Sequence, residues 1–192
     1  MSGMTLENRS TGFTLFELVV VIAIVGILAA IGTPTFKYVT ASNRVASEVN
    51  SLLGDMQYAR SLAIKEGQSV TVCASADQTS CSGANTWHTG WIVFMDPNTN
   101  QNHDAGETIM RVQPAFTGGD TFTGGGTPAF TSATFNRLGY APTGQTVIIN
   151  ISLHDSTNNT QWTRCLAVNP IGSVVTEKNG EHLFGATATT CS

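Results

Sequence analysis

The sequence predicts an α+β protein in which a long N-terminal helix, with a membrane half and an amphipathic half, packs on an antiparallel β-sheet globular domain. Two observations predict this fold. An apolar run from Phe13 to Ile31 passes into a stretch with helical periodicity. From Ser69 onward, short segments rich in Val, Ile, Thr and aromatic residues alternate with Gly, Pro, Asn and Asp. The chain has 192 residues, which suits one domain of ordinary size behind the apolar segment.

The apolar run contains one charged residue, Glu17. Its 19 residues approach the ~20 that a helix needs to span a bilayer, and a lone carboxylate there costs about 3 kcal/mol unless it is paired. The polar-to-apolar boundary, Gly12-Phe13, precedes the run, so cleavage there keeps the helix on the mature protein, unlike cleavage of a secretory signal. The residues alone leave two alternatives open: Glu17 pairs with the new Phe13 amine of a neighbouring subunit, or it snorkels to the lipid headgroups.

Beyond the apolar run, the helix is expected to continue to about Glu66, with Gly67 as its stop signal and with Pro34 and Gly32 bending or loosening it. Apolar residues at steps of three and four predict an amphipathic stripe: Val45, Val49, Leu52, Met56, Ala59 and Ala63. Polar residues are expected on the other faces: Arg44, Glu48, Asp55 and Lys65.

Seven segments after the helix are predicted to be strands: 69–75, 90–96, 108–113, 132–136, 146–153, 163–169 and 173–177. Residues 118–128, with the sequence GGDTFTGGGTP, are expected to form a flexible loop or a weak hairpin.

Composition points to an extracytoplasmic domain. Charged residues make up 11% of the chain, the formal net charge is -4, and there is no basic block, so bulk electrostatics do not favour non-specific nucleic-acid binding. The four cysteines lack CxxC or zinc-finger spacing. An even number behind an export-type segment favours two disulfides, with buried free thiols as the alternative. Of three possible pairings, Cys73–Cys81 and Cys165–Cys191 are favoured, since each brackets a short loop or tail.

The N-terminal string Gly12-Phe13-Thr14-Leu15-Phe16-Glu17 resembles the class III signal of type IV pilins and type II secretion pseudopilins. The resemblance implies that a prepilin peptidase cuts after Gly12 and methylates Phe13. It also implies that Glu17 is needed for assembly and that Pro34 is the helix-kinking proline of pilins. The sequence departs from the family at one point, because Thr11 rather than Lys or Arg precedes Gly12.

Later segments resemble the GspH/FimT group of minor pilins. They are MQYARSLAIKEGQSVTVC (56–73), WHTGWIVFMD (87–96) with the Asn-rich loop, Glu107 and Arg111 that follow, and FNRLG (135–139). With the N-terminus, the resemblance implies four parts. These are a leader peptide (1–12), a transmembrane or assembly helix (13–33), the amphipathic half of the helix (34–67) and a β-rich periplasmic GspH/FimT-like domain (68–192).

One loop has the oxygen-ligand spacing of an EF-hand calcium site, at positions 1, 3, 5, 7, 9 and 12: Asp96, Asn98, Asn100, Asn102, Asp104 and Glu107. The sixth position, where a glycine is expected, is Gln101, and no helices are predicted to flank the loop. The alternative is a polar β-hairpin turn, because Asn and Asp favour turns. Calcium is the only cofactor that the sequence suggests.

The sequence thus suggests a minor pilin of a type IV pilus that primes assembly near the tip. Its expected partners are other major and minor pilins, the prepilin peptidase and the inner-membrane assembly machinery. It is expected as a single-pass protein of the bacterial inner membrane with its globular domain in the periplasm, and in the fibre after assembly. The alternatives are a minor pseudopilin of type II secretion and a DNA-uptake pilin. The resemblance does not favour DNA binding, since some FimT-type pilins that serve DNA uptake carry a Gly-Arg-x-Arg motif and the comparable stretch here, Gly172-Ser173-Val174-Val175, lacks both arginines. No catalytic motif is present, so an enzyme is not expected.

Overall fold

A computed structural model describes residues 12–125, 129–141, 149–157, 159–182 and 191. It divides into two compact units, Met1–Thr40 and Ala41–Ser192. Residues 1–11 of the predicted leader, 126–128 of the predicted glycine-rich loop and 146–148 of a predicted strand lie outside the described residues.

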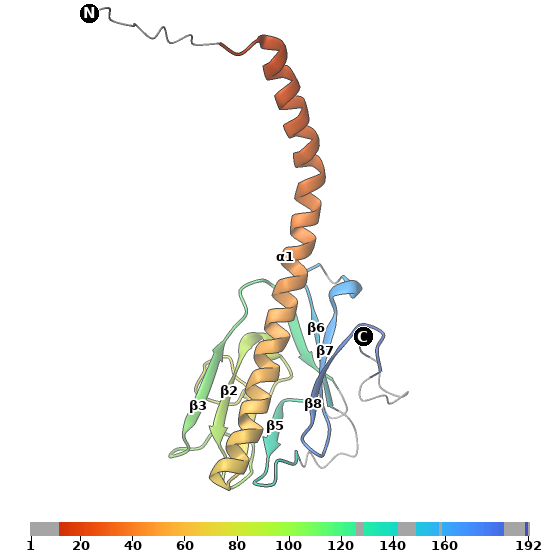
Figure 1. Cartoon of the computed structure of the whole chain (residues 1–192). Helices are drawn as coiled ribbons and strands as arrows, with labels where there is room; N and C mark the ends of the chain where they lie inside the picture. Colours follow the sequence, from red (N-terminus) through yellow and green to blue (C-terminus); the bar gives the residue numbers. More distant parts are fainter. Residues whose placement is uncertain (1–11, 126–128, 142–148, 158, 183–190, 192) are drawn as a thin grey trace, which may run out of the picture. The chain divides into compact units, whose positions relative to one another are not determined.

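Helix α1 runs from Leu15 to Glu66 (Figure 1). Its backbone stays helical through Pro34, and the predicted bend at this proline stays a prediction. The helix ends where the sequence predicts, because Gly67 adopts a left-handed φ of 67° that terminates helices at low cost. Among the described residues, no helix combines the length and the hydrophobicity needed to cross a membrane.

The described residues of the globular unit form two four-stranded antiparallel sheets. The first has the order β3-β2-β1-β5, formed by Ile109–Pro114, Gly90–Met95, Val70–Ala74 and Ser132–Phe135. The second has the order β4-β6-β7-β8, formed by Thr121–Gly124, Ile149–His154, Arg164–Val168 and Val174–Lys178. Two short 3-10 helices, η1 (Trp87–Thr89) and η2 (Thr160–Trp162), lie in the connections.

Strand β4 corrects the prediction for residues 118–128. Thr121–Gly124 is a strand paired with β6, in the register Phe122↔Leu153, and an isolated bridge joins Thr123 to Thr86. Phe122 is fully buried, so this glycine-rich stretch contributes to the core rather than forming only a loop.

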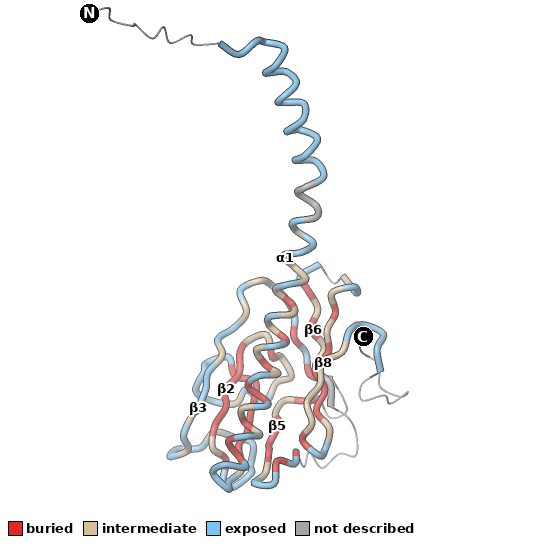
Figure 2. The backbone as a smooth tube through the Cα atoms, in the orientation of Figure 1, coloured by how far each residue is buried: buried red, intermediate tan, exposed pale blue. Residues whose placement is uncertain are grey.

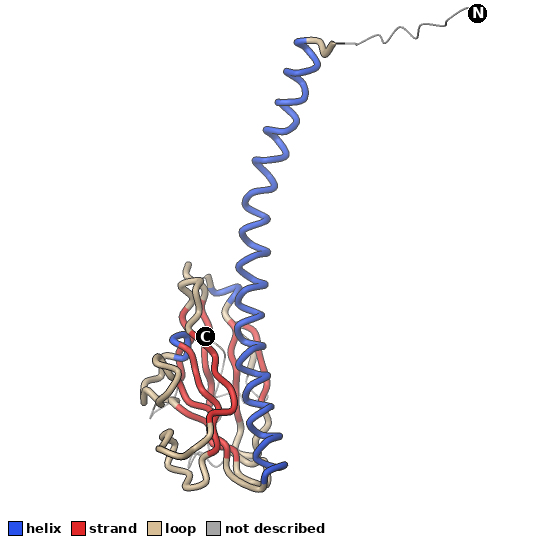
Figure 3. The backbone as a smooth tube through the Cα atoms, turned by 90° about the vertical axis from the view of Figure 1, so that its left-hand side faces the viewer, coloured by secondary structure: helices blue, strands red, loops and turns tan. Residues whose placement is uncertain are grey.

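The core lies between the strands and the part of α1 that belongs to the globular unit (Figures 2 and 3). All six members of the predicted stripe are buried: Val45, Val49, Leu52, Met56, Ala59 and Ala63. They belong to one apolar cluster with Trp91 and Val93 of β2 and Leu166 of β7, so this cluster includes residues of the helix and of both sheets. This contiguous apolar cluster provides the main stabilisation of the unit.

Candidate functional site

The proposed processing site lies just outside the helix. Gly12 and Phe13 are non-helical, and Phe13 is 80% exposed. Thr14 ends this segment as the N-cap of α1, because its Oγ1 accepts a hydrogen bond from the backbone N–H of Glu17 at 3.2 Å. The Thr14 carbonyl accepts the next helical bond, from the N–H of Leu18. The spacing Thr-x-x-Glu is that of a capping box, so the helix begins two residues later than a start at Phe13.

Glu17 occupies the first helical turn, where the positive end of the helix dipole favours a carboxylate. The large apolar side chains around it are all exposed: Phe13, Leu15, Phe16, Leu18, Val19, Val20, Val21, Ile22, Ile24, Val25, Ile27, Leu28 and Ile31. A surface of this extent is typical of an interface with other molecules. Among the described residues, the Glu17 side chain has no ion-pair partner.

In the globular unit, Asp55 of α1 is the centre of a polar cluster. One carboxylate oxygen accepts a hydrogen bond from Trp91 Nε1 at 2.8 Å, and the other pairs with Arg111 Nη1 at 2.8 Å. The Arg111 guanidinium also stacks on the Tyr58 ring, 3.7 Å from its centroid. Asp55 was expected on a helix face other than the apolar stripe, and at 9% exposure it is nevertheless buried.

A second cluster joins α1 to the ends of β4 and β6. Arg44 makes two hydrogen bonds of 2.6 Å to Asp120, whose side chain is fully buried. Asp120 also accepts the N–H of Ser156 at 2.9 Å. Burial and the neighbouring Asp120 carboxylate raise the pKa of Glu48 to about 7, and its Oε2 atom is buried without a hydrogen-bond partner. Glu48 therefore competes with Asp120 for the single positive charge of Arg44.

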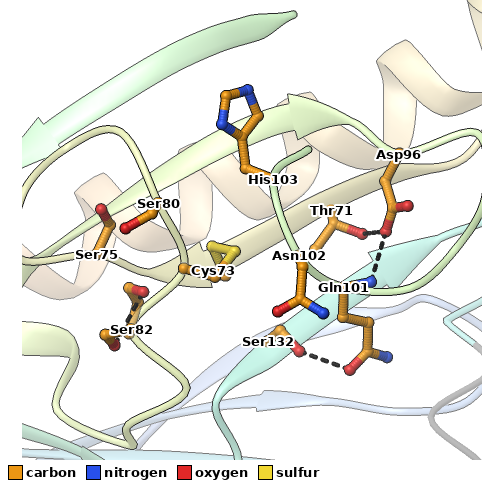
Figure 4. The surroundings of a disulfide bond; sticks show 12 residues. Thr71, Cys73, Ser75, Ser80, Ser82, Asp96, Gln101, Asn102, His103 and Ser132 are labelled. Carbon is orange, nitrogen blue, oxygen red and sulfur yellow. Dashed lines mark hydrogen bonds between the residues drawn. A yellow bond between two sulfur atoms is a disulfide. The ribbon is translucent and has the colours of Figure 1, made fainter. Parts of the chain in front are cut away.

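The Asn-rich loop uses its polar groups within the protein. Buried Asp96 accepts hydrogen bonds from Thr71 Oγ1 at 2.6 Å and from the N–H of Gln101 (Figure 4). It also accepts the N–H of Asn100. Asp104 accepts the side-chain amides of Asn98 and Asn100, which lower its pKa.

The candidate calcium ligands follow the same pattern. Asn102 donates its N–H to Asn100, and Glu107 accepts the N–H of Asp104. The described residues contain no group of three or more His, Cys, Asp or Glu side chains that could hold a metal ion. One oxygen, Glu107 Oε1, is buried and lacks a hydrogen-bond partner. The calcium site stays a prediction, and a calcium titration that leaves the melting temperature unchanged would rule it out.

His103 connects the Asn-rich loop to the loop closed by the Cys73–Cys81 disulfide, which includes Ser80 (Figure 4). Its Nδ1 lies 2.8 Å from the Thr79 carbonyl and its Nε2 lies 3.1 Å from the Glu107 carbonyl. The ring meets Phe94 edge-on, with centroids 5.3 Å apart. The two loops thus cover the face of β2 that points away from α1.

Both favoured disulfides are present. Cys73–Cys81 closes a loop of 8 residues beside β1, and Cys165–Cys191 joins β7 to the C-terminal segment over 26 residues. The described residues contain no free cysteine. Cys73 packs with Ile92 and Phe94, whereas Cys165 and Cys191 pack with Ala167, so each bond is part of a small apolar cluster.

Arg60 of α1 joins the turn after β5 to the turn between β7 and β8. Its Nε donates to the Gly139 carbonyl at 2.9 Å and its Nη2 donates to the Ile171 carbonyl at 3.4 Å. Gly139 and Gly172 both have positive φ, 76° and 79°. A Cβ atom at Gly172 would lie 1.9 Å from the Gly139 carbonyl oxygen, so the two turns meet backbone to backbone. The sequence resemblance included FNRLG without indicating this contact.

The stretch 172–175 is next to Arg60 but has no cationic side chain of its own. Arg164 and Lys178 face each other across β7 and β8. Glu177 and Glu181 lie in the same region; burial and Glu181 raise the pKa of Glu177. Cations are therefore offset by carboxylates here, an arrangement that does not favour phosphate binding.

Two family models match the chain. Residues 48–172, more than half of it, match the family described as type II transport protein GspH, and residues 8–33 match the prokaryotic N-terminal methylation motif. Pilins and pseudopilins of this kind are structural proteins. The processing and assembly residues predicted from the sequence, Gly12, Phe13 and Glu17, lie inside the methylation motif.

The chain is similar in sequence to fimbrial proteins. The chain is 38% identical over 68 residues to a type IV major fimbrial protein FimA of Dichelobacter nodosus. This alignment covers 35% of this chain and 43% of that protein. It is 40% identical over 68 residues to a fimbrial protein of Pseudomonas aeruginosa, covering 35% and 44%. The alignments thus span less than half the length of these relatives.

The fold is similar to that of a solved minor pilin. A crystal structure of the type IV minor pilin FimU of Pseudomonas aeruginosa aligns with a TM-score of 0.53 and 18% identity, over 74% of this chain and 92% of that one. The likeness covers an N-terminal helix packed on antiparallel sheets. The chain thus has a pilin-like fold, carries an N-terminal methylation motif and belongs to the GspH family.

Proposed function

We propose that the chain is a minor pilin of a type IV pilus that primes fibre assembly near the tip. One observation carries the proposal. Glu17 is the only charge in an exposed apolar helical segment, and this segment begins directly after a Gly12-Phe13 boundary that lies outside the helix. Such a segment needs an apolar environment, and its carboxylate needs a cation.

In this proposal a prepilin peptidase cuts the Gly12–Phe13 bond and methylates Phe13. Neither residue has helical backbone hydrogen bonds, so the bond can enter an active site without unwinding α1. Before assembly, the apolar segment keeps the chain at the inner membrane, with the globular unit in the periplasm. In the fibre the segment joins a bundle of helices from other major and minor pilins, delivered by the inner-membrane assembly machinery.

Glu17 then pairs with the Phe13 amine of a neighbouring subunit. In the pair the two charges neutralise each other within an apolar bundle, and the contact fixes the axial register of the helices. The variant Glu17→Ala should therefore be processed normally but poorly incorporated into fibres. Glu17→Asp retains the charge and should be incorporated better than Glu17→Ala. Wild-type incorporation of Glu17→Ala would refute the pairing.

The decisive test is the number of surface pili on cells that lack the gene, with a complemented strain as control. Loss of pili that returns on complementation supports the proposal. Mass spectrometry of the mature protein should give an N-methylated Phe13 as its first residue. Any other N-terminus argues against a pilin.

A second candidate is a minor pseudopilin of type II secretion, because the matching family is described as a type II transport protein. This candidate predicts normal pili and reduced protein secretion in the same deletion strain. Loss of DNA uptake with normal pili would instead support a DNA-uptake pilin.

A further inference from the structure

The exposed apolar side chains of the globular unit are not evenly distributed. Among the described residues of Ala41–Ser192, six large hydrophobic side chains are exposed: Ile64, Met110, Val112, Leu138, Tyr140 and Ile171. Met110 and Val112 belong to β3. The other four, which we call the end patch, lie around the end of α1.

The chain segments that carry the end patch lie next to one another. A Cβ atom at Gly139 would lie 2.8 Å from Ile64 Cδ1, so the turn carrying Leu138 and Tyr140 touches the last helical turns. Gly172 meets Gly139 backbone to backbone, which brings Ile171 beside them. The exposed fractions are 52% for Ile64, 66% for Leu138, 45% for Tyr140 and 60% for Ile171.

Hydrogen bonds hold the backbone beneath the end patch. Asn136 Oδ1 accepts the N–H groups of Leu138 and Tyr140, and Asn169 Oδ1 accepts the N–H of Ser173. Arg60 donates to carbonyls of both turns. The apolar side chains are thus presented by backbone that is already ordered, which lowers the entropic cost of binding.

Two hollows border the end patch. One, of about 340 Å³, is lined by Gln57, Arg60, Ser61, Ile64, Gly172, Ser173 and Val174. The other, of about 430 Å³, is lined by Gly67, Gln68, Ser69, Pro97, Asn136, Arg137 and Leu138. Side chains of a partner can enter such hollows, as in specific protein interfaces.

The border of the end patch is cationic. Arg60 and Arg137 line the two hollows, and Lys65 follows Ile64 near the end of α1. Among the lining and helix-end residues, Glu66 is the one carboxylate, and it pairs with Lys65 at 3.0 Å. The whole chain has a net charge of -4, so this end differs in sign from the rest. An apolar centre with a cationic rim is complementary to an apolar surface rimmed by carboxylates.

We propose that the end patch is the docking surface for a neighbouring pilin subunit that presents an apolar face bordered by carboxylates. The proposal rests on the proposed function, because it is the fibre that supplies such a neighbour. The surface is small, so the contact gains strength from the simultaneous association of the helices. A nucleic acid would use the border cations and the Tyr140 ring instead of Leu138 and Ile171, and adducts with it are a separate outcome of the test.

Photo-crosslinking in piliated cells tests the contact directly. A benzoylphenylalanine residue replaces Leu138 or Ile171 in the full chain, and matched controls place it at Met110 or Val112. These controls are also apolar and exposed, at 38% and 44% against 66% for Leu138 and 60% for Ile171, but they lie on the edge strand β3. The patch positions should give adducts that mass spectrometry identifies as another pilin, and the controls should not. No adduct, or adducts only with lipid or nucleic acid, would overturn the proposal.

Charge variants supply the second measurement. Ile171→Glu and Leu138→Glu should lower the amount of subunit in sheared fibres about tenfold, while Met110→Glu has little effect. Arg137→Glu should lower it as well, and Arg137→Lys should restore it. N-terminal processing and the melting temperature should not change. Equal incorporation of patch and control variants would overturn the proposal.

The two proposals fail in different ways. If the wild-type chain is absent from fibres, the proposed function is wrong. Crosslinks in the membrane fraction then still show whether the end patch contacts another pilin. If wild type is incorporated and Glu17→Ala is not, but patch variants are incorporated normally, only the end patch is wrong.

Discussion

The indole N–H of Trp91 on β2 donates a 2.8 Å hydrogen bond to the carboxylate of Asp55 on α1. Trp91 is fully buried, and the same carboxylate pairs with Arg111 of β3. One acidic side chain therefore connects the helix to two adjacent strands.

Replacing Asp55 should be strongly destabilising. Asp55→Ala leaves a buried indole N–H unsatisfied and a guanidinium unpaired, so we expect a loss of about 3 kcal/mol in the free energy of unfolding. Asp55→Asn retains an acceptor for Trp91 and should lose less. Urea unfolding of the full chain in mild detergent measures both, and equal losses would contradict the role of the indole bond.

Gly172→Ala should destabilise the folded chain by more than the cost of placing an alanine at positive φ. Gly172 and Gly180 have nearly the same φ, 79° and 81°, but a Cβ at Gly180 meets nothing within 4 Å. Gly180→Ala therefore reports the conformational cost alone, about 1 kcal/mol. Gly172→Ala adds the clash with the Gly139 carbonyl, for a total of about 3 kcal/mol. Thermal unfolding of both variants provides the comparison, and equal shifts would mean that the turns separate at little cost.

The free energy of unfolding should fall as the pH rises from about 5 towards neutrality, because of Glu48. Its pKa is about 7 in the folded chain and near 4.5 in a model peptide. The folded state therefore binds more protons between these values, and its stability decreases from about pH 5 to pH 7.5. After allowance for solvent screening, the effect is about 1 kcal/mol.

Glu48→Gln is the control for this titration. The neutral amide should remove the decrease and leave the variant more stable than wild type at pH 8. Arg44 and Asp120 stay in place in both proteins, so their contributions cancel. Parallel pH profiles of the unfolding free energy would show that Glu48 is not the group that titrates.

The two disulfides should contribute unequally. Loop-closure entropy gives about 2.5 kcal/mol for the 8-residue loop of Cys73–Cys81 and about 3.5 kcal/mol for the 26-residue loop of Cys165–Cys191. The double variant C165S/C191S should therefore melt at a lower temperature than C73S/C81S. The reverse order would mean that native packing, rather than loop length, sets their contributions.

Thr14 should determine where the helix begins. Thr14→Ala removes the acceptor for the Glu17 N–H and should weaken the first turn by about 1 kcal/mol, whereas Thr14→Ser keeps it. Hydrogen exchange at the amides of Glu17 and Leu18, in detergent micelles, should be faster only in the alanine variant. Unchanged exchange would mean that the dipole and neighbouring turns suffice.

The sequence predicted the structure best where residue type alone determines the environment of a position, as for buried apolar side chains and for a helix-terminating glycine. The stripe through Leu52 and Met56 predicted the buried face of α1, and Gly67 predicted its end. The burial of Asp55 was not predicted, because its partners Trp91 and Arg111 are distant in the chain.

Strand β4 and the Arg60 contact were missed for related reasons. Thr121–Gly124 has one large apolar residue, Phe122, and becomes a strand through pairing with β6. Arg60 donates to main-chain carbonyls. Every residue has such a carbonyl, so no sequence pattern identifies these acceptors.

The contact between the two glycine turns has a consequence for how this scaffold can diversify. Arg60, Gly139 and Gly172 meet through main-chain carbonyls and a guanidinium, so the side chains of Leu138 and Ile171 make no part of that contact. They point outward from backbone that is held in place without them. Their chemical identity can therefore drift, or be redesigned for another neighbour, while the architecture beneath remains unchanged.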